Sequence, residues 1–284
     1  MTRKVRIDAL PESAYRQHER DAIVGIDVML GATTIVTAVA QGRRAFAARN
    51  AQEARTLARS LEQPLLVHEG AERAPEGFDN QMGPAALSRR TDVARPLVLV
   101  SPWSGLLANT AEKATVYVAC FRNLQATIET LAEEHSHVAL LGAGFGGEQR
   151  CEDRIAAAWI ARKLVERGFE AEDMTTVQEM TSWADADMSL VSWGKSADYL
   201  RRQKREDDLE FVLGHHDDLL LVCRYEGGEV FAVEGQVHLR RAVSGPVRMA
   251  YVSASDMAAG DTGRVRDNVV EFVRGARLGR KATS

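Results

Sequence analysis

Residues 23–40, IVGIDVMLGATTIVTAVA, decide the class of fold that this chain adopts. The first part, from Ile23 to Leu30, is an apolar run that only Gly25 and Asp27 interrupt. Short strands without polar alternation are buried on both faces, which is typical of parallel sheets that helices cover. Because a helical segment follows from Ala32 to Ala40, the stretch predicts one strand–helix unit of an α/β protein.

The chain on either side of this stretch repeats the alternation of short apolar runs and helical runs. Asn50 is expected to cap the helix that follows it, and residues 226–228 (Glu-Gly-Gly) are expected to turn a hairpin. Strands are expected at residues 44–48, 65–68, 97–100, 115–120, 138–141, 219–225, 229–234 and 247–252. Helices are expected at residues 51–61, 123–135, 152–167, 175–192, 196–204 and 267–278.

Composition excludes several classes of protein. A net charge of -4 over 284 residues gives no general electrostatic reason to bind nucleic acid. No apolar run approaches the roughly 20 residues that cross a bilayer, and the start, Met1 to Lys4, lacks the apolar core of a signal peptide. Three cysteines without a C-x-x-C spacing argue against a disulfide framework and a structural zinc site. We therefore expect a cytoplasmic protein without a membrane partner.

Asp27 is the first candidate functional residue. A carboxylate at the end of an apolar strand is costly to bury unless it binds something. Thr33 and Thr34 then open a helix, whose free N–H groups favour an anion. The segment predicts a carboxylate metal ligand beside a helix end that accepts phosphate. The alternative is a helix cap followed by two β-branched core residues.

Polar or glycine residues follow four other expected strands, around Glu69, Ser104, Asn123 and Gly144. Functional residues of open α/β sheets collect beyond the carboxyl ends of the strands, so a site is expected there. Each position also has a structural explanation as a solvated loop, a tight turn or a helix cap. Two adjacent acids, Glu152 and Asp153 at a helix start, would bind a metal ion or simply suit the helix dipole.

The order and spacing of these segments resemble those of the 2-phosphosulfolactate phosphatases over roughly residues 20–235. Residues 27–38 resemble that family's D-V-L-R-A-T-T-T-I-V-T-A-L signature, with Leu30 in place of the arginine and Ala32 in place of the first threonine. Glu69 matches the glutamate of the E-R-x-G motif, whose arginine is Gly70 here. Residues 76–84 resemble the family's G-F-D-x-G-N-S-P segment, with Met82 and Gly83 in place of the Asn-Ser pair.

Five further segments carry the resemblance. Residues 101–105 stand at a T-T-N-G turn, with Ser104 in place of the asparagine. Residues 121–123 are similar to S-F-x-N. Residues 142–147, before Glu152-Asp153, are similar to A-G-T-x-G before an E-D pair. Residues 207–211 resemble a D-I-E-F segment, and residues 192–195 resemble S-x-H-G without its histidine. Arg73 is the nearby basic residue that would substitute for the missing arginine.

The resemblance implies a fold of two three-layer α/β/α units with parallel or mixed sheets. The expected domains are residues 1–145, residues 146–235, and a C-terminal extension, residues 236–284, that packs on the second domain. It also implies Mg²⁺-dependent hydrolysis of the phosphate ester of a small acid, by an enzyme whose homo-oligomeric state is left open. The implied catalytic residues are Asp27, Glu69 and Asp79, and the implied metal ligands are Asp27, Glu69, Glu152 and Asp153. The implied substrate- and phosphate-binding residues are Thr33, Thr34, Arg73, Ser104, Gly105, Arg122, Asn123, Gly144 and Gly147.

The positions that differ from the family are mostly anion-binding positions, while the acidic residues are kept. Each lost charged contact would weaken binding of an anion by about 1.5–3 kcal/mol. Our hypothesis is a retained metal centre with a changed substrate, 2-phosphosulfolactate or a less anionic analogue. The alternatives are a different enzyme of specialised metabolism and a protein that binds a metabolite without turnover.

Overall fold

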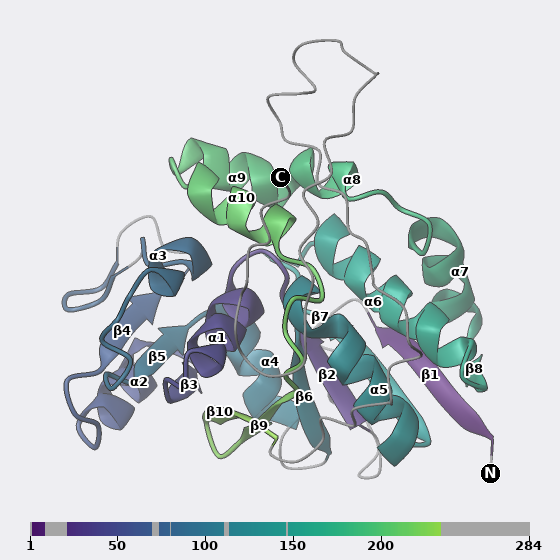
Figure 1. Cartoon of the computed structure of the whole chain (residues 1–284), viewed down its shortest axis with the longest axis horizontal. Coiled ribbons are helices and arrows are strands. Elements are labelled where there is room, and N and C mark those ends of the chain that lie inside the picture. Colours follow the sequence, from purple (N-terminus) through teal and green to yellow (C-terminus); the bar gives the residue numbers. More distant parts are fainter. Residues whose placement is uncertain are drawn as a thin grey trace, which may run out of the picture. The chain divides into compact units, whose positions relative to one another are not determined.

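The computed structural model describes residues 2–8, 22–69, 74–79, 81–110, 114–145 and 147–233. All of them fall within the first of two compact units, Met1–Val237. Their strands form one ten-stranded mixed sheet with helices packed against it (Figure 1), which confirms the α/β class predicted from the sequence. The expected strand at 247–252, the helix at 267–278 and the whole C-terminal extension lie outside the described residues.

Strand order in the sheet is mixed because one hairpin separates two groups of parallel strands. The hairpin strands β9 and β10 pair with each other and with both neighbours in antiparallel fashion. Gly227 and Gly228, with φ of 58° and 92°, form the tight turn that the sequence predicts. In sheet order the strands are β4 (Leu65–His68), β5 (Leu97–Val100), β3 (Ala45–Ala48), β10 (Glu229–Ala232), β9 (Cys223–Glu226), β6 (Thr115–Ala119), β2 (Ala22–Ile26), β7 (His137–Gly142), β1 (Arg3–Asp8) and β8 (Phe169–Ala171).

Strands from both sides of residue 145 take part in this sheet, since β9 and β10 lie between β3 and β6. The expected layout of two units with a boundary near residue 145 stays a prediction.

The helices match the expected segments with a few differences. Asn50 caps α2, because its side chain accepts the N–H of Glu53 at 2.9 Å. The helix expected at 175–192 is two helices, and Asp187 accepts the N–H of Ser189 at the start of the second. The described helices are α1 (Gly31–Ala40), α2 (Ala51–Ala58), α3 (Pro84–Ser88), α4 (Pro102–Thr110), α5 (Leu124–Glu134), α6 (Cys151–Val165), α7 (Met174–Trp183), α8 (Ser189–Ser192), α9 (Lys195–Arg202) and α10 (Glu206–Gly214), with a 3₁₀ turn, η2 (Phe121–Asn123).

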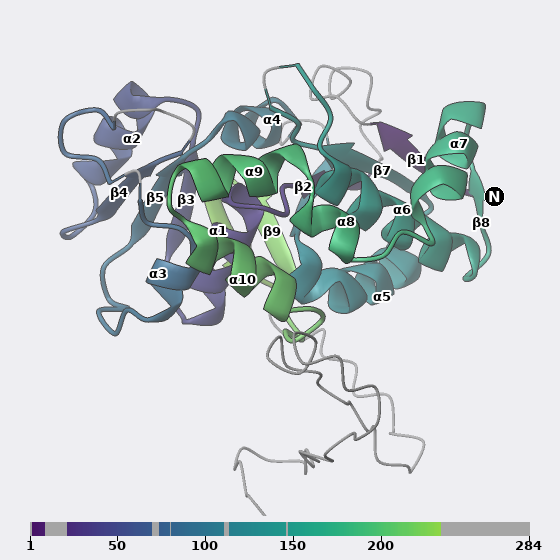
Figure 2. The ribbon, with the colours of Figure 1, turned by 90° about the horizontal axis from the view of Figure 1, so that it is seen from above.

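Strand β2 is buried on both faces, as its composition predicts. Val24 and Ile26 lie in one hydrophobic core together with Ile155 of α6. Ile23 faces a second core, together with Ile35 of α1. Helices α8, α9 and α10 lie together above one end of the sheet, and the view of Figure 2 shows α9 and α10 crossing over α1.

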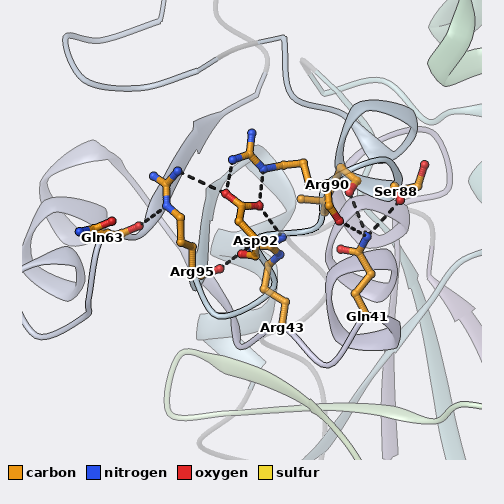
Figure 3. A network of polar contacts seen from close by, with 8 residues as sticks. Gln41, Arg43, Gln63, Ser88, Arg90, Asp92 and Arg95 are labelled. Atoms are coloured by element: carbon orange, nitrogen blue, oxygen red, sulfur yellow. Dashed lines mark hydrogen bonds and ion pairs between the residues drawn. The ribbon is translucent and has the colours of Figure 1, made fainter.

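A polar network fixes the far end of α1 to the loop before β5 (Figure 3). Arg43 is buried, and its guanidinium donates to the Asp92 carbonyl at 2.9 Å, to the Asp92 carboxylate at 3.2 Å and to the Arg95 carbonyl. Arg90 also pairs with the same carboxylate. Hydrogen bonds from Arg90 and Arg43 hold the pKa of Asp92 below its ordinary value. The network anchors the helix whose other end carries the candidate site.

Cysteine placement agrees with the sequence: Cys120 and Cys223 are buried free thiols, and Cys151 is half-buried. Within the described ranges, no helix combines the length and apolar character that crossing a membrane requires.

Candidate active site

A cavity of about 370 Å³ opens beside the start of α1, and five carboxylates line it, one of which is Asp198 of α9. Asp27 directly follows β2, Glu69 directly follows β4, and Glu152 and Asp153 lie in the first turn of α6. These are the four acids that the sequence predicts to act together. The structure therefore gathers them around one space, although they come from three separate segments of the chain.

Gly31 lies beside both Asp27 and Glu69. A methyl group added there would overlap Asp27 Oδ2 and would lie 3.3 Å from Glu69 Oε2. Both carboxylates therefore border the space beside Gly31, where the family signature has alanine.

Hydrogen bonds hold the two acids of α6 in position. Asp153 is buried, and its Oδ1 accepts the backbone N–H of Val28 at 2.9 Å. Glu152 is 1% exposed, and the Cys151 thiol donates to its Oε2 at 3.3 Å. These contacts place the α6 acids next to the turn that carries Asp27.

Burial and mutual repulsion make the cluster costly to ionise. Burial, with a further contribution from the charge of Glu152, raises the pKa of Asp27 to about 6. Burial and the nearby charge of Asp27 raise the pKa of Glu69 and of Asp153 as well. Like charges gathered away from water are typical of sites that bind a cation or transfer a proton.

The donor set fits a hard divalent cation, because Mg²⁺ prefers carboxylate oxygens and water. In the part of the chain that the structure describes, no three acidic, histidine or cysteine side chains stand close enough together to hold a metal ion by themselves. These observations are compatible, since Mg²⁺ commonly binds through one or two carboxylates and completes its shell with water and substrate phosphate.

The opposite wall of the cavity comes from residues that the sequence analysis did not select. One face of α9 contributes Lys195, Tyr199 and Arg202, and the loop after β7 contributes Phe145. Arg150, at the start of α6, lies over the Phe145 ring at 5.3 Å. The available signals were the S-x-H-G resemblance at residues 192–195, which leads into α9, and the glycine-rich segment 142–147, which contains Phe145.

Gly144, one of the expected phosphate-binding residues, lines the cavity. Gly147 does not line it but has a φ of 76° in the same loop, a conformation that favours glycine. Arg73 lies outside the described residues.

Asp79 lies at a different hollow and does not line this cavity. Its Oδ1 accepts the backbone N–H groups of Gln81 and Met82 at 2.7 and 3.1 Å. The expected catalytic role of Asp79 has no support from this position.

The expected anion-binding side chains of α1 and α4 are engaged in the core instead. Thr33 donates to the Val28 carbonyl at 2.6 Å, and Thr34 is buried within α1. Ser104 is buried against Ser101, at 3.2 Å between their hydroxyl oxygens, and Gly105 follows it within α4. None of these four expected residues lines the cavity.

Arg122 and Asn123 also have structural partners. Arg122 forms a two-point ion pair with Asp218, at 3.1 and 2.6 Å, and donates to Thr37 Oγ1 at 3.0 Å. The Asn123 side chain accepts the Cys120 N–H and donates to the Val118 carbonyl, so it caps η2. Neither lines the cavity, and the alternative of a structural cap describes Asn123 better than substrate binding does.

Comparisons with known proteins identify the family of this chain. The family model described as 2-phosphosulpholactate phosphatase matches residues 8–228. A protein of Pseudothermotoga lettingae named probable 2-phosphosulfolactate phosphatase is 32% identical over 55% of this chain and 66% of its own length. Proteins with the same name from Synechococcus sp. (strain CC9605) and Deinococcus radiodurans are 32% and 28% identical, over 72% and 60% of this chain and 84% and 71% of their own lengths. The chain therefore belongs to the 2-phosphosulpholactate phosphatase family, a family of phosphoric monoester hydrolases.

Proposed function

We propose that this protein is a Mg²⁺-dependent phosphatase that hydrolyses the phosphate ester of a small acid. The observation that carries the proposal is the meeting of Asp27 and Glu69 at Gly31, in a cavity that Glu152 and Asp153 also line. Four carboxylates that ionise together in one cavity repel one another and destabilise the fold, and a bound cation would offset that cost.

Asp27 and Glu69 would bind the ion, water and the substrate phosphate would complete its shell, and Glu152 and Asp153 would add negative charge to the same cavity. When bound, Mg²⁺ supplies a Lewis acid that neutralises phosphate oxygens and helps to position the attacking water. A carboxylate that the ion does not take, such as that of Glu152, would then be available in the cavity to accept the proton of that water.

The other lining residues act on the substrate directly. Arg150 and Lys195 place two positive charges at the cavity, where they attract the phosphate dianion. Met29 and Leu30 are buried and apolar, and they keep water away from the acids. Electrostatic interactions strengthen in such surroundings, so charge that develops on the phosphate is stabilised more than in water.

Leu30 supports a changed substrate. It lines the cavity at the position where the family resemblance has an arginine. An apolar side chain there offers no partner for a sulfonate or carboxylate. A substrate less anionic than 2-phosphosulfolactate suits this wall better.

Phosphate release with Mg²⁺ across a panel of phosphorylated hydroxy acids tests the proposed function. We expect turnover that a chelator abolishes, that Glu69→Gln reduces at least a hundredfold, and that Asp185→Asn leaves unchanged. Asp185 is a matched control because its carboxylate is 94% exposed, on the surface. If the panel binds without any release of phosphate, the protein is a metabolite-binding member of the family and the proposal is wrong.

A further inference from the structure

The cavity has a second, apolar wall that metal binding and phosphate binding do not require. Phe145 is 43% exposed, an unusual position for a large aromatic ring, and it faces the same cavity as Leu30 and Pro102. Tyr199 of α9 lies beside it, with ring centroids 6.4 Å apart. Aromatic side chains with exposed faces in a cavity are typical of sites that receive an apolar group of a ligand.

The Phe145 ring is held in place by its loop. The backbone N–H of Phe145 donates to the Glu148 carbonyl at 2.8 Å, and the N–H of Glu148 donates back at 3.1 Å. Gly144, with a φ of 58°, allows this tight turn, and a Cβ there would lie 2.8 Å from the Glu148 carbonyl oxygen. Two backbone hydrogen bonds to Glu148 therefore hold Phe145, which carries the ring.

The basic side chains that line the cavity differ in their ion-pair partners. Lys195 donates to Glu148 at 2.8 Å, and Arg150 lies 3.6 Å from the same carboxylate. Arg202 forms no ion pair with any residue of the described ranges. Lys195, Tyr199 and Arg202 are four and then three positions apart, so they share the cavity-facing side of α9, while Ala197 and Leu200 are buried.

We infer that the substrate is a phosphate monoester of a hydroxy acid with an apolar substituent. Its carboxylate pairs with Arg202, and its hydrocarbon or aromatic group lies against Phe145 and Tyr199. This inference rests on the proposed function for the position of the phosphate, at the acidic end of the cavity. The face of α9 and the Phe145 turn then decide which phosphorylated acid the enzyme accepts.

Binding of unreactive phosphonate analogues tests the inference separately from turnover. The probes are phosphono acids that differ in one substituent, methyl, phenyl or sulfomethyl, and a phenyl analogue whose carboxylate is replaced by a carboxamide. Calorimetry in Mg²⁺ should show the phenyl acid binding at least about tenfold more tightly than the sulfomethyl acid. Tighter binding of the sulfomethyl acid overturns the inference.

Two variants test separately the contact of the carboxylate with Arg202 and that of the apolar group with Phe145. Arg202→Gln should weaken the phenyl acid about tenfold and leave the carboxamide unchanged. Phe145→Ala should weaken the phenyl acid and leave the methyl acid unchanged, and Phe145→Leu should restore part of the loss. The control is Lys204→Gln, because Lys204 is exposed and lines no part of the cavity. The proposed contacts are wrong if Arg202→Gln weakens binding of the phenyl acid and its carboxamide equally. They are also wrong if Phe145→Ala weakens binding of the phenyl and methyl acids equally.

The two proposals fail in different ways. If the phenyl acid binds as stated but no ester is hydrolysed, the substrate class stands and the phosphatase function is wrong. If esters are hydrolysed but the phenyl group gives no preference in binding or in kcat/KM, the function stands and the substrate class is wrong.

Discussion

Asp27 Oδ2 and Glu69 Oε2 face the same point beside Gly31, although their strands, β2 and β4, have five other strands between them in the sheet. In a flat sheet with strands ~4.8 Å apart, six steps would separate these strands by ~30 Å. Because both acids lie beside Gly31, the sheet cannot be flat between β2 and β4. The carboxylate pair is therefore a product of the whole fold.

Replacing Gly31 with leucine should separate the pair, whereas alanine should be tolerated because the family signature has alanine at this position. The first added carbon already overlaps Asp27 Oδ2 and lies 3.3 Å from Glu69 Oε2, so a larger side chain fills the space beside both carboxylates. Leucine suits a helix better than glycine does, so the helix itself is kept. For Gly31→Leu we expect at least a tenfold loss of Mg²⁺ affinity and of kcat, measured by calorimetry and phosphate release, with a native circular dichroism spectrum. Unchanged Mg²⁺ affinity in a folded Gly31→Leu variant would show that the pair does not hold the ion.

Replacing Asp27 with asparagine should stabilise the metal-free protein in a pH-dependent way. The pKa of Asp27 is raised to about 6 from an ordinary 3.8, so the folded state holds its proton more tightly than the unfolded state. The resulting penalty is absent below pH 3.8, grows as the pH rises, and is complete above pH 6. We expect the free energy of unfolding of the variant to exceed that of the wild type by about 3 kcal/mol at pH 7 in the presence of a chelator.

Thermal or urea unfolding of both proteins at pH 4, 5, 6 and 7 measures this difference. Saturating Mg²⁺ should reverse its sign, because the ion stabilises only the protein that binds it. A difference that stays constant from pH 4 to 7 would contradict the proposed cost of ionisation.

Arg122→Met distinguishes a structural arginine from an anion-binding one. The guanidinium pairs with Asp218 and donates to Thr37 within the fold, so its loss leaves both partners with unsatisfied groups. We expect the free energy of unfolding to fall by about 2 kcal/mol, with KM for phosphate esters unchanged. A tenfold rise in KM without loss of stability would return Arg122 to the substrate site that the sequence predicted.

Asp92→Asn should destabilise the protein at neutral pH without affecting turnover. Hydrogen bonds from Arg90 and Arg43 lower the pKa of Asp92, so its ionised form stabilises the fold. That contribution is complete above the ordinary pKa of 3.8 and is lost as the pH falls through the lower folded value. The gap in melting temperature between wild type and variant should shrink below pH 4. A gap that widens toward acid would mean that the network in Figure 3 does not favour the carboxylate.

The sequence predicted those helices and turns whose ends have characteristic residues. Asn50 accepts the Glu53 N–H as a cap should, and Gly227 and Gly228 turn the β9–β10 hairpin. Strand β1 escaped prediction because its residues alternate in charge and burial and contain no continuous apolar run. Helix α4 escaped because the segment after β5 was interpreted as a turn, although Pro102 suits the first turn of a helix.

The site was predictable where acids follow apolar strands, as Asp27 and Glu69 do. Arg202 and Tyr199 were not predictable, because only the packing of α9 brings them to the cavity from a distant part of the chain. Thr33 and Arg122 show the opposite case: their types suit an anion, but each has a partner within the fold, and their expected role stays a prediction. Sequence shows which groups need partners, and the fold decides where the partners come from.

Direct titration of the metal-free protein with Mg²⁺, at pH 7.5 and followed by calorimetry, tests the central claim that the carboxylate cluster binds a catalytic cation. The account predicts saturable binding to the wild type and to Asp185→Asn, and loss of that binding in the Asp27→Asn, Glu69→Gln double variant. Equal binding by the wild type and the double variant would contradict it.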